Sequence, residues 1–86
     1  MTTITLRYFS WLREKLHKDR EVITLSPETH DIADVLRVLY QRGGDYDILK
    51  HNQKILRYAR NQQFAKQNDK IKHGDEIAIF PPITGG

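Results

Sequence analysis

The sequence predicts an α+β fold in which a mixed β-sheet wraps around one main helix. Two observations predict it: short segments of alternating apolar and polar residues occur near both ends of the chain, and one long amphipathic segment lies between them. Strands that surround a single helix are typical of a sheet that carries the helix on one face. The 86 residues are enough for one domain.

The first part of the chain is expected to form two strands joined by a short helix. In TITLRYF, Ile4 and Leu6 face one side and Phe9 faces the other, which is typical of a half-buried strand. Ser10 is the candidate N-cap of the short helix. The expected elements are, in order, a strand over 3–9, a helix from Ser10 to Leu16, a turn over 17–20 and a strand over 21–25.

The main helix is expected in DIADVLRVLYQRGG. Asp31 is a candidate N-cap, and Gly43 stands where a left-handed C-terminal cap is expected. The apolar positions recur with the period of one helix face, at Ile32, Val35, Leu36, Leu39 and Tyr40. This face should cover the sheet.

The second part of the chain is expected to complete the sheet. The expected elements are a short irregular or helical stretch around 46–49, a strand over 54–60, a turn at 61–62, a short strand over 63–65, a turn over 73–75 and a strand over 76–80. The most economical arrangement places the first and last strands side by side and parallel in the middle, with the helix crossing beneath. That is the β-grasp, or ubiquitin-like, architecture.

The end of the chain is expected to be an extended tail, 81–86, on a domain formed by 1–80. Pro81 and Pro82 lack backbone N–H groups and fix φ, so the chain should leave the sheet as a stiff extended segment. Gly85 and Gly86 add a thin, flexible end that can enter a narrow slot. Phe9 and Phe80 should lie close together and exposed where this tail departs, as a docking surface.

Composition excludes several classes of site. The apolar content of 38% and charged content of 29% leave no room for a membrane span, and the N-terminus lacks a signal-peptide pattern, so we expect a cytoplasmic protein. Cysteine is absent, and the four histidines lack the spacing of a metal site. The sequence contains neither a nucleophile–base set nor a phosphate-binding loop. It therefore gives no sign of catalysis by the chain alone.

Three segments resemble the small subunit of molybdopterin synthase, a ubiquitin-like sulfur carrier. They are GDEIAIFPPITGG at 74–86, LRYFSWLREKL at 6–16 and DIADVLRVL at 31–39, so that the resemblance covers most of the chain. The chain departs from the family pattern at Arg60, where an apolar residue is usual, and at Gln62, where glycine often follows the asparagine.

The resemblance implies that an adenylating enzyme related to ubiquitin-activating enzymes uses Mg-ATP to convert the Gly86 carboxylate to an acyl-adenylate. A sulfur donor then converts it to a thiocarboxylate. Within a heterotetrameric synthase, the large subunit would use this sulfur on cyclic pyranopterin monophosphate to build the molybdopterin dithiolene. The chain itself would bind no cofactor and no metal. Two groups of residues would serve its partners: Pro81, Pro82, Ile83, Thr84 and Gly85 thread the tail, and Phe80, Phe9 and Arg13 bind partner proteins.

Other functions remain open at this stage. A sulfur carrier for thiamine or for a tungsten cofactor would share most of these features, and a ubiquitin-like modifier would use the same activated carboxylate. A small RNA-binding module is the alternative from another class, because KILRYAR at 54–60 offers basic residues beside the aromatic Tyr58. We expect the binding partners to be proteins and not nucleic acids or membranes.

Overall fold

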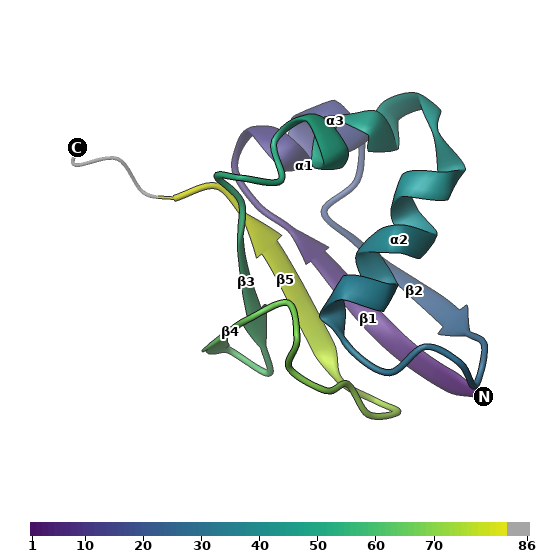
Figure 1. The fold of residues 1–86 in the computed structure, drawn as a ribbon. Helices are drawn as coiled ribbons and strands as arrows, with labels where there is room; N and C mark the ends of the chain where they lie inside the picture. Colours follow the sequence, from purple (N-terminus) through teal and green to yellow (C-terminus); the bar gives the residue numbers. More distant parts are fainter. Residues whose placement is uncertain (83–86) are drawn as a thin grey trace.

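Five strands form one mixed sheet in residues 1–82, which are the ones that the computed structural model describes. They are β1 (Thr2–Tyr8), β2 (Arg20–Leu25), β3 (Arg57–Arg60), β4 (Gln63–Ala65) and β5 (Glu76–Phe80). Their order in the sheet is β2-β1-β5-β3-β4, with β1 and β5 parallel and the other neighbours antiparallel (Figure 1). The predicted central parallel pair is therefore confirmed.

The helices lie together on one face of this sheet, and the main helix crosses it (Figure 1). They are α1 (Trp11–Leu16), α2 (Ile32–Arg42), the 3-10 turn η1 (Gly44–Tyr46) and α3 (Asp47–His51). The alternation in β1 and β5 and the apolar face of α2 together form the core, whose fully buried members include Ile4, Leu6, Tyr8, Leu36, Leu39, Ile77 and Ile79. The arrangement is the predicted β-grasp fold.

The predicted N-cap of α2 is confirmed, and the predicted C-cap is confirmed in part. The backbone N–H of Asp34 donates to Asp31 Oδ1 at 2.9 Å, so Asp31 is the N-cap. Gly43 follows the helix with a positive φ of 65°, as expected for a glycine C-cap. Its ψ of −160° is extended, however, so the expected left-handed helical cap is not formed.

Two local predictions are wrong. Ser10 precedes α1 but its side chain makes no capping hydrogen bond; the residue has a φ of 59°, and only its carbonyl accepts, from the N–H of Arg13 at 3.1 Å. The strand expected from residue 54 begins at Arg57. The N–H groups of Ile55 and Leu56 both donate to the Asn52 carbonyl, which holds this segment in a turn and withdraws these two donors from a strand ladder.

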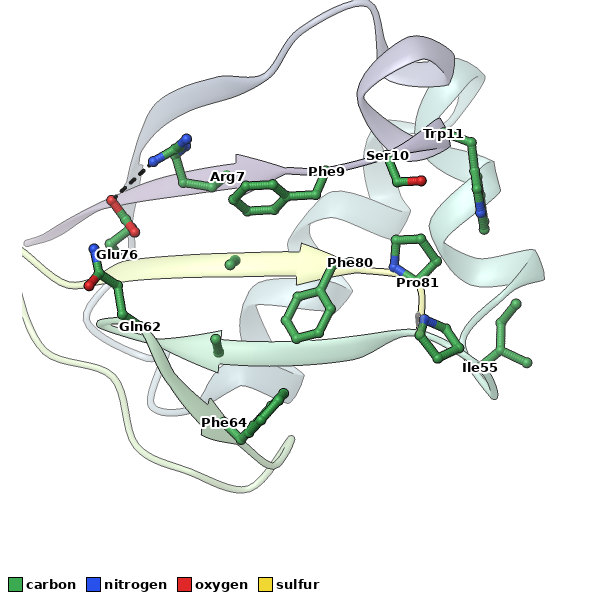
Figure 2. A pocket seen from close by; sticks show the side chains of 13 residues that line it. Arg7, Phe9, Ser10, Trp11, Ile55, Gln62, Phe64, Glu76, Phe80 and Pro81 are labelled. Atoms are coloured by element: carbon green, nitrogen blue, oxygen red, sulfur yellow. Dashed lines mark ion pairs between the residues drawn. The ribbon is translucent and has the colours of Figure 1, made fainter. Parts of the chain in front are cut away.

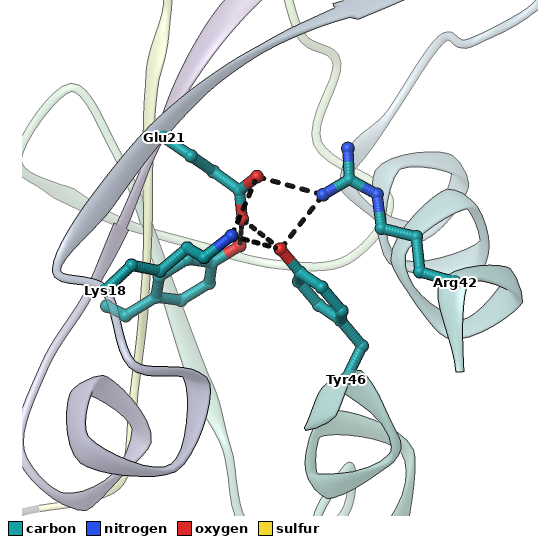
Figure 3. A network of polar contacts seen from close by, with 5 residues as sticks. Lys18, Glu21, Arg42 and Tyr46 are labelled. Atoms are coloured by element: carbon teal, nitrogen blue, oxygen red, sulfur yellow. Dashed lines mark hydrogen bonds and ion pairs between the residues drawn. The ribbon is translucent and has the colours of Figure 1, made fainter. Parts of the chain in front are cut away.

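A polar network joins the sheet to the helical layer (Figure 3). Tyr8 Oη and Tyr46 Oη donate to Glu21 Oε2 at 2.8 and 2.7 Å, and Arg42 Nη1 donates to Oε1 at 2.9 Å. Lys18 Nζ completes it by donating to Tyr46 Oη. Burial alone would raise the pKa of Glu21, but the hydrogen bonds from the two tyrosines and Arg42 outweigh it and hold the pKa below its usual value. The network fixes the end of α2 against β1 and β2.

A second polar cluster, around Asp75, fixes the strands that carry the chain toward the tail. Asp75 is 6% exposed and accepts from Arg60 Nε at 2.6 Å, Asn61 Nδ2 at 3.0 Å and the backbone N–H of Lys72 at 2.7 Å. Asn61 and Gln62 form the two-residue hairpin between β3 and β4 with φ values of 52° and 70°. Arg60, where the family pattern has an apolar residue, thus has a structural partner in this chain.

Candidate functional site: a groove on the open face of the sheet

The face of the sheet opposite the helices carries a groove whose floor is made of two alanines. Strand register aligns Arg7 of β1 with Ala78 of β5, Ala78 with Ala59 of β3, and Ala59 with Phe64 of β4. Side chains directly opposite one another lie on the same face of a sheet. The two small residues therefore lie low between a charged side chain on one flank and an aromatic ring on the other.

Aromatic side chains form the walls of this groove (Figure 2). Phe64 and Phe80 contact each other with ring centroids 6.1 Å apart, and Phe64 is 86% exposed. The groove has a volume of about 850 Å³. Its lining consists of Arg7, Phe9, Ser10, Trp11, Ile55, Ala59, Gln62, Phe64, Glu76, Ala78, Phe80, Pro81 and Pro82. A mainly apolar exposed groove of this kind is typical of a protein-binding surface.

The structure brings the two predicted phenylalanines into the same groove. Phe9 is 38% exposed and Phe80 is half-buried, and both side chains point to the open face (Figure 2). Phe80 packs on Phe64, whereas the Phe9 ring lies against the Arg7 guanidinium, whose central carbon is 5.2 Å from the ring centroid. The surface is thus broader than the pair that the sequence predicts.

The start of the predicted tail belongs to the groove. Pro81 and Pro82 line it at the end where β5 finishes. Ile83, Thr84, Gly85 and Gly86, the other predicted tail residues, lie outside the described residues. Arg13, predicted to bind partners, is exposed on α1 and does not line the groove. Its role stays a prediction.

Sequence reasoning missed two important members of the site, Arg7 and Phe64. Arg7 is an outward-facing residue of β1, and its position matters only because the alanines of β3 and β5 lower the surface beside it. Phe64 enters the groove because the hairpin after Arg60 turns β4 back along β3. An exposed phenylalanine in a three-residue strand was the available signal for Phe64.

The basic segment considered for RNA binding does not form a stacking surface. Tyr58 is 5% exposed and belongs to the core, and burial raises the pKa of its hydroxyl to about 12. Arg60 points to Asp75, with Nε and Oδ2 2.6 Å apart. The aromatic ring and one of the cations required for that function are therefore used by the fold.

In residues 1–82, no three acidic, histidine or cysteine side chains come together in a way that could hold a metal ion. The described helices include none that combines the length and the apolar character needed to cross a membrane.

Comparison with known proteins identifies the family. The model of the ThiS family matches residues 6–86. A molybdopterin synthase sulfur carrier subunit from Chlamydomonas reinhardtii is 34% identical over 74 residues, covering 80% of this chain and 89% of that protein. The same subunit from Haemophilus influenzae is 32% identical over 83 residues, covering 96% and 99%.

Solved structures show the same fold at lower identity. SAMP1 from Haloferax volcanii has a TM-score of 0.78 at 21% identity, covering 98% of this chain and 99% of that chain. A chain from the complex of subunits 1 and 2 of the molybdopterin-converting factor of Helicobacter pylori has a TM-score of 0.69 at 22% identity, covering 99% and 100%. With the β-grasp fold and nearly full-length similarity to sulfur carrier subunits, this chain belongs to the ThiS family.

Proposed function

We propose that this protein is the sulfur-carrier subunit of a molybdopterin synthase and that the carboxylate of Gly86 carries the sulfur. The observation that supports this most is the 32% identity to the H. influenzae sulfur carrier subunit over 96% of the chain. The FPPITGG ending and the open-face groove beside Pro81 fit the same role. The protein would not be an enzyme by itself, because its partners would supply the catalysis.

The proposed loading takes place in two steps. The Gly86 carboxylate first attacks the α-phosphate of Mg-ATP at the adenylating enzyme, which forms an acyl-adenylate and releases pyrophosphate. A sulfur nucleophile from a donor system then displaces AMP from the carbonyl carbon and leaves a thiocarboxylate. ATP and magnesium would bind to the adenylating partner and not to this chain.

The proposed unloading requires the large subunit of the synthase. The thiocarboxylate sulfur attacks cyclic pyranopterin monophosphate there, and hydrolysis of the acyl link returns the Gly86 carboxylate while the sulfur stays on the pterin. Two rounds supply the two sulfurs of the dithiolene. The H. pylori relative was solved as a complex of subunits 1 and 2 of its converting factor, which supports a large-subunit partner for this chain.

The open-face groove is the proposed docking surface for these partners. Phe64 and Phe9 present exposed aromatic area, and the half-buried Phe80 lines the groove between them. Aromatic residues contribute strongly to binding energy at protein interfaces. Pro81 and Pro82 lie at the end of this groove, so a partner seated there would meet the tail as it departs. Docking and delivery of Gly86 would then be parts of one binding event.

The test is the mass of the C-terminal peptide after loading. The purified protein is incubated with the adenylating enzyme of its host, Mg-ATP and a sulfide source, and the C-terminal peptide is mapped by mass spectrometry. We expect exchange of one oxygen for sulfur on Gly86, trapped by a thiol alkylator and abolished by deletion of Gly86. Peptide mapping is essential, because oxidation of Met1 or Trp11 produces a similar mass change.

The outcomes separate the candidate functions. An unmodified Gly86, with the enzyme active on a known carrier, would exclude the sulfur-carrier function. Loading on Gly86 followed by failure to convert the pterin with the large subunit would indicate a carrier for another pathway, such as thiamine or a tungsten cofactor. An isopeptide bond between Gly86 and a lysine of another protein would indicate a ubiquitin-like modifier.

A further inference from the structure

Arg7 stands in the wall of the groove with hydrogen-bonding capacity that the fold does not use. Its Nη1 is 3.6 Å from Glu76 Oε2, which is too long for a normal hydrogen bond (Figure 2). Its Nε is buried and has no hydrogen-bond partner among the described residues. A buried donor without an acceptor is unfavourable. A second molecule cannot reach this buried atom, but the side chain as a whole is 34% exposed. The terminal N–H groups of the guanidinium therefore remain open to an acceptor from a partner.

A second arginine, Arg20, lies at the paired position on the neighbouring strand β2. The register of β1 and β2 pairs Arg7 with Arg20, and side chains paired in this way share one face. Arg20 is exposed, and it makes no ion pair within residues 1–82. Like charges in direct opposition destabilise a sheet. Arg20 lies on the strand next to Arg7 and does not line the groove itself. Glu76 is the only acidic residue among those that line the groove, so with Arg20 nearby the flank that carries Arg7 is positively charged.

The groove therefore has two chemically different flanks on either side of the alanine floor. One flank is apolar and carries Phe64 and Phe80. The other flank carries Arg7, whose guanidinium lies over the Phe9 ring at 5.2 Å. Contact with an aromatic ring holds a guanidinium in place and leaves its edge free for a planar acceptor. The matching surface is an apolar side chain with a carboxylate next to it.

We propose that Arg7, with Arg20 beside it, binds a carboxylate of the large subunit that covers the groove. This rests on the proposed function, in which the open face is the docking surface. The planar fork of an arginine fits a carboxylate with two parallel hydrogen bonds, which adds specificity as well as affinity. Arg7 is then the residue by which this surface selects an acidic partner, while the phenylalanines supply general apolar contact.

The experiment measures the affinity of the full-length protein for the purified large subunit of the same organism, by isothermal titration calorimetry. We expect Arg7→Gln to weaken binding about 10- to 100-fold, the range expected when hydrogen bonds to a charged group are lost. Arg7→Lys should recover only part of this, because a lysine cannot form the bidentate contact. The matched control is Arg37→Gln, which removes the same charge from an exposed site on α2 in the helical layer; it should stay within about twofold of wild type.

A spectroscopic readout separates a contact at Arg7 from a general effect of charge. The terminal guanidinium N–H signals of Arg7 are followed by ¹⁵N NMR in the free protein and in the complex. We expect a shift and slower exchange with water for Arg7 in the complex, and neither for Arg37. Thermal unfolding of Arg7→Gln checks that the variant is folded.

The possible results separate three statements: the carboxylate site at Arg7, the docking surface in the groove and the proposed function. A further variant, Phe64→Ser, is measured in the same way and tests the apolar part of the groove. If Phe64→Ser loses binding while Arg7→Gln behaves like Arg37→Gln, the groove docks the partner but the carboxylate site is wrong. If neither Phe64→Ser nor Arg7→Gln changes binding, the docking surface is wrong as well. If the wild-type protein does not bind the large subunit, the proposed function fails and the inference fails with it. The wild-type protein is also tested for binding to a single-stranded RNA probe. If it binds the RNA, and Arg7→Gln abolishes that binding without changing the affinity for the large subunit, the partner class is wrong.

Discussion

Two arginine–carboxylate pairs differ sharply in how much of their bonding capacity the fold uses. Asp75 is buried and takes hydrogen bonds from Arg60, Asn61 and the Lys72 backbone, with the shortest contact at 2.6 Å. Arg7 and Glu76, on the open face, approach only to 3.6 Å. The hydrogen-bonding capacity of the Arg60–Asp75 pair is thus used within the fold, whereas that of the Arg7–Glu76 pair is largely unused.

The difference indicates separate roles for the two pairs. The Arg60–Asp75 pair joins the β3–β4 hairpin to the segment before β5, so that removing either partner leaves buried polar atoms unsatisfied. The Arg7–Glu76 pair can be opened without such a cost, because both side chains are about one-third exposed and water can replace the partner. Stability should depend on the first pair, and partner binding on the second.

The largest expected effect is on Asp75. Asp75→Ala removes four hydrogen bonds and leaves Arg60 and the Lys72 N–H without their acceptor. We expect the free energy of unfolding to fall by about 2–4 kcal/mol, measured by urea denaturation. Glu76→Ala is the matched control on the open face and should cost less than about 1 kcal/mol. Equal effects of the two variants would remove the distinction between the pairs.

Acid should weaken the Asp75 pair in a predictable direction. Burial alone would raise the pKa of Asp75, but hydrogen bonds from Arg60, Asn61 and Lys72 outweigh it and lower the pKa in the folded state. The unfolded chain then takes up the proton first as the pH falls below about 4, the ordinary value for aspartate. The stabilisation is therefore complete at neutral pH and is lost as the pH falls toward the folded pKa.

The measurement is the urea stability of wild type and Asp75→Asn between neutral pH and the acid limb. We expect a shallower acid dependence in the variant, since one carboxylate with a lowered pKa has been removed. Glu21, whose pKa is also lowered, keeps its contribution in both proteins. Identical acid slopes would show that Asp75 does not contribute to the acid limb.

Replacement by glutamine should affect mainly stability at Arg60 and mainly partner binding at Arg7. Arg60→Gln is expected to lower the free energy of unfolding by about 1–2 kcal/mol, because Asp75 stays buried with fewer donors. Arg7→Gln should change it by less than about 0.5 kcal/mol, as is usual for open-face positions. Binding to the large subunit should show the reverse order. Urea denaturation and calorimetry on both variants check this, and a loss of stability at Arg7 equal to that at Arg60 would contradict it.

A small stabilising effect is expected at the hairpin that the Asp75 cluster supports. Gln62 has a φ of 70°, a conformation that costs a side-chain-bearing residue about 1–2 kcal/mol and glycine much less. Glycine gains more freedom in the unfolded chain, so Gln62→Gly should stabilise by only about 0.5 kcal/mol. Thermal unfolding measures it. Destabilisation instead would mean that contacts of the Gln62 side chain outweigh the strain.

Much of the fold could be predicted because it depends on local periodicity. The alternation around Ile4 and Leu6, the helical period of α2 and the alternation of Ile77 and Ile79 each describe one element and its buried face. The errors occurred where tertiary contacts override local preference. Ser10 is held at a positive φ and cannot cap, and the segment before Arg57 turns on the Asn52 carbonyl, two features that have no signature in composition.

The candidate site could be predicted only where it follows the strand ends. Phe9 and Phe80 line the same groove, as expected for parallel central strands that end at the same edge of the sheet, although Phe80 is half-buried and not exposed. Arg7 and Phe64 depend on cross-strand register over four strands, which the sequence does not specify. The partner for Arg60 was missed for the same reason, since Asp75 lies 15 residues away in sequence.

The two alanines on the groove floor make this surface suitable for engineering an orthogonal carrier. In the proposed complex, a larger residue such as leucine at Ala78 would fill the groove and block the large subunit, without entering the core on the other side of the sheet. A partner with a shortened side chain at the matching position would accept the altered carrier and exclude the original one. Two carrier–partner pairs could then operate in the same cell without exchanging sulfur.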